Sequence, residues 1–92
     1  MKYLVRIQVN LSPSLPAAER RELLQAELER GRELIAAGAI AALWRVPGGL
    51  RNVGIWEADD ATELHDLIAS LPLFNWLEAE VTPLAKHPLM RE

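Results

Sequence analysis

The sequence contains no cysteine, so the chain has no disulfide framework and no thiolate metal site. No apolar run approaches the roughly 20 residues that a membrane-spanning helix needs. The first ten residues alternate polar and apolar side chains and lack the apolar stretch of a signal peptide. Positive charge is not in excess, because ten Lys and Arg stand against thirteen Asp and Glu. That balance argues against a nucleic-acid binder. We therefore expect a soluble, cytoplasmic protein.

The length of 92 residues predicts one domain, 1–92, which ends in an irregular tail over residues 83–92. Alternation and breaker residues predict four strands and two helices. Gly38 suits the end of the first helix, and Asp59 or Asp60 the start of the second. The strands are expected over 2–11, 41–47, 52–57 and 76–82, the first helix over 17–37, and the second helix after residue 60.

The resulting order β-α-β-β-α-β is typical of the ferredoxin-like α+β fold, an antiparallel sheet with two helices on one face. The first and last strands each have one apolar side, which fits burial under helices. Their other sides carry Arg6, Gln8, Glu78 and Glu80, and such a face can meet water or a second sheet in a dimer. Three Trp in a short chain also favour self-association.

Glu27 interrupts the amphipathic pattern of the 17–37 helix. At 100° per residue it falls about 40° from Leu23, inside the arc of apolar side chains, whereas the other glutamates of that helix fall on the opposite side. A carboxyl group facing an apolar layer has a raised pKa, which suits an acid or base working near neutral pH. The alternative is that Glu27 pairs with an Arg or lies at the edge of the helix–sheet contact.

Other candidate residues carry weaker signals. Arg45 shares a side of its predicted strand with Leu43, opposite Trp44, and can bind a carboxylate or pair with a Glu. His65 and His87 have no partner at metal-ligand spacing, so no metal site is predicted.

Several short segments resemble the muconolactone Δ-isomerase family in order and spacing over nearly the whole chain. The Leu-Pro-Leu-Phe and His-Pro segments together are the most specific. The segments are Leu43-Trp44-Arg45, Asn52, Leu64-His65-Asp66, Leu71-Pro72-Leu73-Phe74, Glu80-Val81, and Leu84 with His87-Pro88.

The resemblance implies a ferredoxin-like protomer that forms homodimers of the α+β barrel type and then a higher homo-oligomer such as a decamer. It implies a cytoplasmic isomerase of the β-ketoadipate route of aromatic catabolism that uses no cofactor and no metal. The implied reaction moves a double bond in a butenolide lactone, from muconolactone to 3-oxoadipate enol-lactone, through a 1,3-proton transfer.

By the same resemblance Glu27 is the acid/base. Asn52 or a backbone N–H is a candidate donor to the enolate oxygen, and Arg45 or Arg51 a candidate for holding the carboxylate arm. Trp44 and Leu50 complete the expected substrate-binding set. Leu50 and Ala42 stand where the family commonly has Tyr and His, which implies a more apolar pocket and a related or bulkier butenolide.

Two other function classes stay open. One is a non-catalytic ligand-binding or assembly module on the same fold. The other is a related small cofactor-free enzyme, such as a monooxygenase or a lactone dehalogenase.

Overall fold

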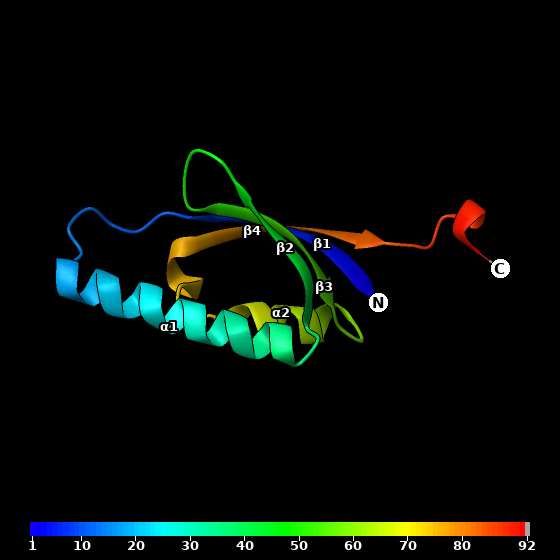
Figure 1. Cartoon of the computed structure of the whole chain (residues 1–92), viewed down its shortest axis with the longest axis horizontal. Helices are drawn as coiled ribbons and strands as arrows, with labels where there is room; N and C mark the ends of the chain where they lie inside the picture. Colours follow the sequence, from blue (N-terminus) through cyan, green and yellow to red (C-terminus); the bar gives the residue numbers. More distant parts are fainter. Residues whose placement is uncertain (92) are drawn as a thin grey trace.

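The computed structural model describes residues 1–91, which fold in the order β-α-β-β-α-β (Figure 1). Short 3₁₀ turns precede and follow the last strand. The elements are β1 (Lys2–Val9), α1 (Ala17–Ala36), β2 (Ile40–Val46), β3 (Arg51–Glu57), α2 (Ala61–Ala69), the turn η1 (Phe74–Trp76), β4 (Leu77–Leu84) and the turn η2 (Pro88–Met90).

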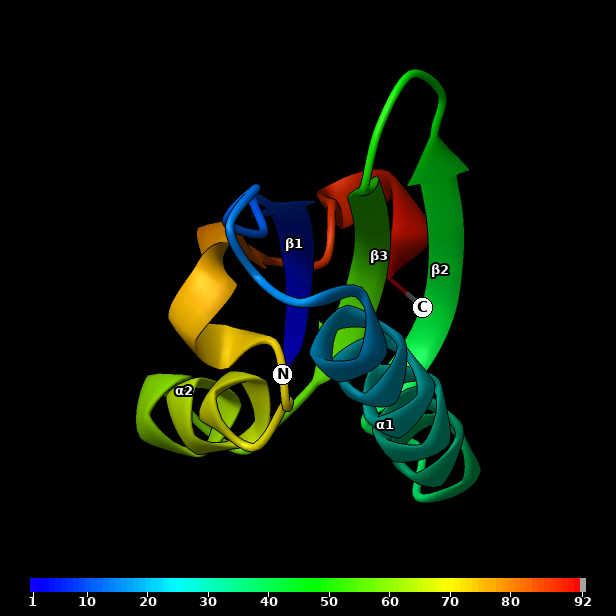
Figure 2. The same ribbon diagram turned by 90° about the vertical axis from the view of Figure 1, so that its left-hand side faces the viewer.

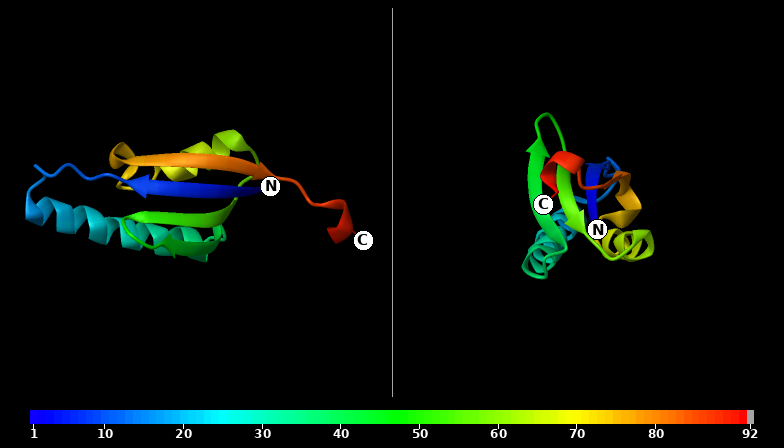
Figure 3. Two further views of the ribbon diagram at one scale, coloured as in Figure 1. Left: turned by 90° about the horizontal axis from the view of Figure 1, so that it is seen from above. Right: turned by 90° about the vertical axis from the view of Figure 1, so that its right-hand side faces the viewer.

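The four strands form one antiparallel sheet in the order β2-β3-β1-β4. Both helices lie on the same face of this sheet (Figure 2), and the opposite face carries no helix (Figure 3). The predicted ferredoxin-like α+β fold is therefore confirmed. Neither helix in the described part of the chain is long and apolar enough to cross a membrane.

The core lies between the helices and the sheet. Tyr3, Val5 and Ile7 alternate along the central strand β1 and are buried on its helix-facing side. Trp56 of β3 pairs with Tyr3 and is 1% exposed. The helices contribute Leu34 from α1, and Leu64 and Ile68 from α2. Leu64 and Ile68 are four residues apart, so one side of α2 packs into the core.

Helix α1 ends in the way that its glycine predicts. Gly38 adopts a φ of +81°, a conformation that L side chains rarely adopt. Its N–H donates to Ile35 O at 3.0 Å, and Ala39 N–H donates to Leu34 O at 2.9 Å. These two bonds satisfy carbonyls that the helix end would otherwise leave free. The chain can then turn sharply from α1 into β2.

Helix α2 begins at the second of the two predicted caps. The Asp60 carboxylate accepts a hydrogen bond from Glu63 N–H at 2.8 Å, so Asp60 and not Asp59 is the N-cap. The bond satisfies one of the free N–H groups of the first turn.

The predicted boundary of the C-terminal tail is wrong by two residues. Strand β4 continues through Pro83 and Leu84, which pair with Tyr3 and Lys2. A proline is tolerated there because β4 is an edge strand, which needs no N–H on its outer side. At the other end β1 stops at Val9, two residues earlier than predicted, and Asn10 N–H bonds to Trp76 O. Residue 92, the last of the predicted tail, lies outside the described residues.

Candidate active site

A cavity of about 280 Å³ lies between α1 and the helix-facing side of the sheet. Most of its wall is apolar, with one carboxyl group, one amide and one guanidinium among the lining side chains. The lining residues are Val9, Leu24, Glu27, Leu28, Arg45, Leu50, Asn52 and Leu73. Four of the six residues predicted to form the site, namely Glu27, Arg45, Leu50 and Asn52, therefore meet at one cavity.

Glu27 is the titratable carboxyl group of this cavity. It is half-buried, and its Oε1 accepts a hydrogen bond from Leu73 N–H at 3.0 Å. Burial raises the pKa of Glu27 above its ordinary value, and the Leu73 hydrogen bond offsets part of that rise. No ion pair to Glu27 occurs among residues 1–91. The group therefore combines a raised pKa with access to a cavity, as a proton-transfer group needs.

The donor to Glu27 comes from a turn that the sequence analysis assigned no role. Leu71 and Leu73 are both buried and anchor this segment in the core. Pro72 between them has no N–H, and the chain turns here through the bond from Phe74 N–H to Leu71 O at 3.0 Å. Leu73 N–H is left to point at α1. A backbone donor leaves no signature in a sequence, although the Leu-Pro-Leu-Phe segment was noticed as part of the family resemblance.

Arg45 and Asn52 reach the cavity from paired positions on β2 and β3. Arg45 is exposed and makes no ion pair among residues 1–91; its Nη1 makes only a long contact of 3.5 Å with Arg51 O. The Asn52 Oδ1 is buried and has no hydrogen-bond partner in the described part of the chain. A buried carbonyl oxygen without a partner is costly, so the Asn52 amide and the Arg45 guanidinium both retain hydrogen-bonding capacity.

A β-bulge sets the side of the sheet to which Arg45 points. Ile40 pairs with Trp56, but Ala42 pairs with Ile55, so Ala41 is an extra residue in β2. Side chains alternate along a strand, and one inserted residue moves every later side chain to the opposite face. Leu43 and Arg45 thereby join Ile40 on the helix-facing side, whereas Ala42 and Trp44 face the other way.

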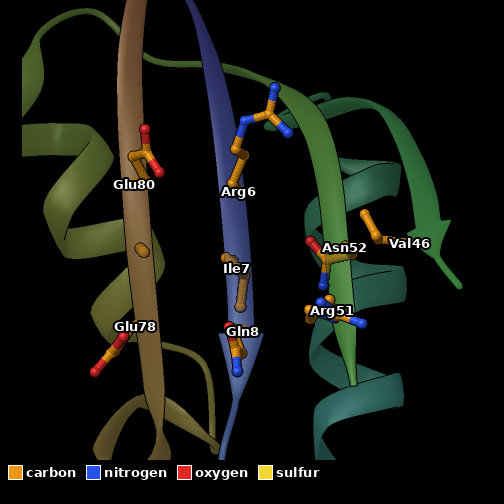
Figure 4. Close-up of a pocket in the computed structure, with 9 residues that line it drawn as sticks. Arg6, Ile7, Gln8, Val46, Arg51, Asn52, Glu78 and Glu80 are labelled. Atoms are coloured by element: carbon orange, nitrogen blue, oxygen red, sulfur yellow. The ribbon is translucent and has the colours of Figure 1, made fainter. Parts of the chain in front are cut away.

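Two predicted site residues lie outside the cavity. Trp44 pairs with Val53 on the free face of the sheet and is 58% exposed. Arg51 also belongs to that face, where it lines a separate hollow of about 360 Å³ together with Arg6, Gln8, Glu78 and Glu80 (Figure 4). Its Nη2 donates to Pro47 O at 3.3 Å in the β2–β3 turn. Alternation along β3 explains the outcome, since Arg51 and Asn52 are neighbours and cannot both face the helices.

The histidines and Ala42 lie away from the cavity lining as well. His65 on α2 is exposed and packs edge-on against Phe74, with ring centroids 5.9 Å apart. The His87 Nδ1 accepts a hydrogen bond from Leu89 N–H in the tail. Within residues 1–91 no three side chains of metal-ligating type gather at one place.

Comparison with known proteins places this site in a family. The family model described as muconolactone Δ-isomerase matches residues 1–89. The muconolactone Δ-isomerase of Cupriavidus pinatubonensis is 41% identical over 88 residues, which are 96% of each chain. That of Rhodococcus opacus is 34% identical over 83 residues, 90% of this chain and 89% of the relative.

The fold agrees with this assignment. A crystal structure of muconolactone isomerase superimposes with a TM-score of 0.89 at 31% identity, and the match covers 96% of this chain and 92% of the other. Family model, relatives and structure all span nearly the whole sequence, and none of the matches is confined to one motif. The chain therefore belongs to the muconolactone Δ-isomerase family.

Proposed function

We propose that this protein isomerises muconolactone, or a closely related butenolide with an anionic arm, to the corresponding enol-lactone. The observation that carries the proposal is a cavity in which a half-buried carboxyl group with a raised pKa, Glu27, shares an apolar wall with Arg45 and Asn52. The names of the relatives, which span the same length, support it. The enzyme would act in the cytoplasm on a product of aromatic catabolism.

The chemistry needs one group that removes a proton and returns it. The ring proton γ to the lactone carbonyl leaves with its bonding electrons staying on the ring, and the charge spreads through the double bond onto the carbonyl oxygen as a dienolate. Protonation at the α carbon then completes a 1,3-shift. We assign both transfers to the Glu27 carboxylate, whose raised pKa brings it closer to the operating pH.

The remaining polar groups have separate tasks. The Asn52 amide is the donor to the developing enolate oxygen, where a fixed dipole lowers the barrier. Arg45 holds the carboxylate arm, because a guanidinium binds a carboxylate through two parallel hydrogen bonds. Leu50, with Val9, Leu24 and Leu28, surrounds the ring with apolar surface. Leu50 offers no hydroxyl to the substrate, which favours butenolides with apolar ring substituents.

We also propose that the protein forms a homodimer and a higher homo-oligomer through the free face of its sheet. Trp44 is exposed there next to Val53, and Leu4 and Ile55 are half-buried on the same face. The same face carries Arg6 on β1, Arg51 on β3, and Glu78 and Glu80 on β4 (Figure 4). A face with both signs of charge can pair with a copy of itself, as a two-fold interface requires.

Glu27→Gln should abolish most of the activity while preserving the fold. The glutamine amide still has an oxygen that can accept from Leu73 N–H, but the amide cannot take up a proton near neutral pH. We expect kcat to fall roughly 10²- to 10⁴-fold. The measurement is an ultraviolet or NMR assay with muconolactone in deuterated water, which also reports deuterium at the α carbon. Glu29→Gln, an exposed change on the same helix, should leave kcat unaltered. A normal kcat in the Glu27→Gln variant would rule out the shuttle.

Glu27 should also make stability depend on pH. Because the folded state has the higher pKa, the folded protein binds this proton more tightly than the unfolded chain. The free energy of unfolding therefore falls as pH rises from about 4.5 through the folded-state pKa. Measured by calorimetry, the melting temperature of the Glu27→Gln variant should exceed that of the unmodified protein at neutral pH. This difference in melting temperature should disappear in acid. A difference in melting temperature that stays constant with pH would contradict a raised pKa of Glu27.

Arg45 and Arg51 can be distinguished by matched substitutions. Arg45→Gln removes the cation of the cavity and should raise KM for muconolactone roughly tenfold or more, the loss expected for a charge-assisted contact. Arg51→Gln removes the same charge from the opposite face and should leave KM within about twofold. Steady-state kinetics on both variants measures this. Equal effects, or a larger effect at Arg51, would contradict the assignment of the cavity.

Self-association should depend on Trp44. Trp44→Glu places a charge in the apolar strip of the free face, and the mass measured by light scattering at micromolar concentration should drop toward that of the single chain. Thr62→Glu adds the same charge at an exposed position of α2 and should not change the mass. If the unmodified protein is itself monomeric at this concentration, the oligomer proposal fails.

A further inference from the structure

Arg30 ties α1 to the end of α2. Its Nε donates to Ser70 Oγ at 3.1 Å, and its Nη1 lies 3.5 Å from Glu33 Oε1 on the same helix. Ser70 Oγ in turn donates to Leu67 O at 2.6 Å, one of the last carbonyls of α2. A cation is favourable at this helix end, because the free carbonyls there carry partial negative charge. The guanidinium is thus held at two of its nitrogens.

This contact lies close in sequence to the one that orients Glu27. Glu27 and Arg30 are three residues apart on α1, so their side chains leave the helix on neighbouring sides. Their partners, Leu73 N–H and Ser70 Oγ, are also three residues apart. Among residues 1–91 these are the two hydrogen bonds that join α1 to the 70–73 segment. The segment is attached to the helix at both of its ends.

The backbone of the 70–73 segment has little conformational freedom at its start. Ser70 N–H and Leu71 N–H bond back into α2, at 3.0 Å to Asp66 O and 3.1 Å to Ile68 O. Pro72 has a restricted φ. These bonds and the fixed φ of Pro72 leave few free torsions between Ser70 and Leu73, so the position of Ser70 affects where Leu73 N–H points.

We infer that Arg30 and Ser70 are positioning residues for Glu27: they hold the 70–73 segment against α1, so that Leu73 N–H stays on Glu27 Oε1 and the second carboxylate oxygen is presented for proton transfer. The inference rests on the proposed function only in that Glu27 is the group that transfers the proton. Neither Arg30 nor Ser70 lines the cavity, so their effect passes through the geometry of another residue.

The other charged groups around Glu27 are few. Arg45 lines the same cavity from β2, whereas β1, β3 and the 70–73 segment contribute the uncharged Val9, Asn52 and Leu73. From α2, His65 packs on Phe74, next to the segment. Arg45 and His65 stay unchanged in the variants proposed below, so a change in the titration of Glu27 reports on the Leu73 bond and on the charge of Arg30. Removal of one positive charge from the far side of α1, in Arg32→Gln, controls for the long-range electrostatic effect of losing the Arg30 charge.

The experiment measures the titration of Glu27 by carboxyl carbon NMR in the whole protein, without substrate. The variants are Arg30→Gln, Ser70→Ala and both together, with Arg32→Gln as the control, because Arg32 is exposed on the same helix. A hydrogen bond to the ionised carboxylate lowers its pKa, so loosening the Leu73 bond should move the midpoint to higher pH in Arg30→Gln. Ser70→Ala, which alters no charge, should move it in the same direction.

The shifts of the Glu27 midpoint caused by Arg30→Gln and Ser70→Ala should not be additive, since each substitution removes the same contact. Because Leu73 N–H bonds to Glu27 Oε1, the amide shift of Leu73 should follow the Glu27 titration in the unmodified protein and should lose part of that dependence in both variants. With muconolactone, kcat should fall about three- to tenfold with little change in KM, and the acidic limb of the rate profile should move to higher pH. Arg32→Gln should show none of these changes.

The outcomes separate this inference from the proposed function. If Ser70→Ala leaves the Glu27 midpoint and the Leu73 amide unchanged, or if Arg30→Gln merely matches Arg32→Gln, the positioning role is overturned. If the midpoint moves as expected but no butenolide is isomerised, the positioning role holds and the proposed function fails.

Discussion

The candidate site depends on one constraint, which is that α1 must place a carboxyl group against the apolar side of the sheet and still let it ionise. Full burial of Glu27 would hold the carboxyl neutral at a large cost in free energy, and full exposure would leave it an ordinary glutamate. The structure lies between these limits, because Glu27 is half-buried and accepts one backbone hydrogen bond from Leu73. That bond supports the charged form, while the apolar wall of Leu24, Leu28 and Leu50 opposes it.

A second consequence concerns stability. An apolar residue in place of Glu27 would make the folded state more stable, since it would bury more apolar surface without desolvating a charge. The carboxyl group therefore has a local cost, and the polar contacts around it limit that cost. Such sites are common in enzymes, because replacing an active-site residue often makes the folded protein more stable while it lowers activity.

The two faces of the sheet carry different features. The helix-facing side carries the core at one end and the cavity at the other, and the free side carries Trp44, a mixed set of charges and no helix (Figure 3). On strand β3, Arg51 lines the hollow on the free face, whereas its neighbour Asn52 lines the cavity as well as that hollow (Figure 4). The proposed chemistry and the proposed self-association therefore use opposite faces of one sheet.

Local patterns in the sequence determined the elements and their order. Alternation in the 2–9 segment, the glycine at position 38 and the aspartate at position 60 each predict a feature through near-neighbour physics, and each is present. The helical period alone also put Glu27 on the apolar side of α1. The strand pattern offered Arg45 as a candidate carboxylate binder, and the family resemblance added Asn52.

Tertiary structure decided the rest, for reasons that sequence periodicity does not contain. The extra residue Ala41 decides which face β2 side chains occupy, and a bulge depends on the pairing partner. Alternation separates Arg45 from Trp44 and Asn52 from Arg51, but only the pairing of the strands shows which member of each pair faces the helices. Leu73 reaches Glu27 across 46 positions of sequence through a backbone N–H that every residue except proline possesses. The candidate acid/base, Glu27, could be inferred from local spacing, whereas the groups that surround it are brought together only by long-range packing.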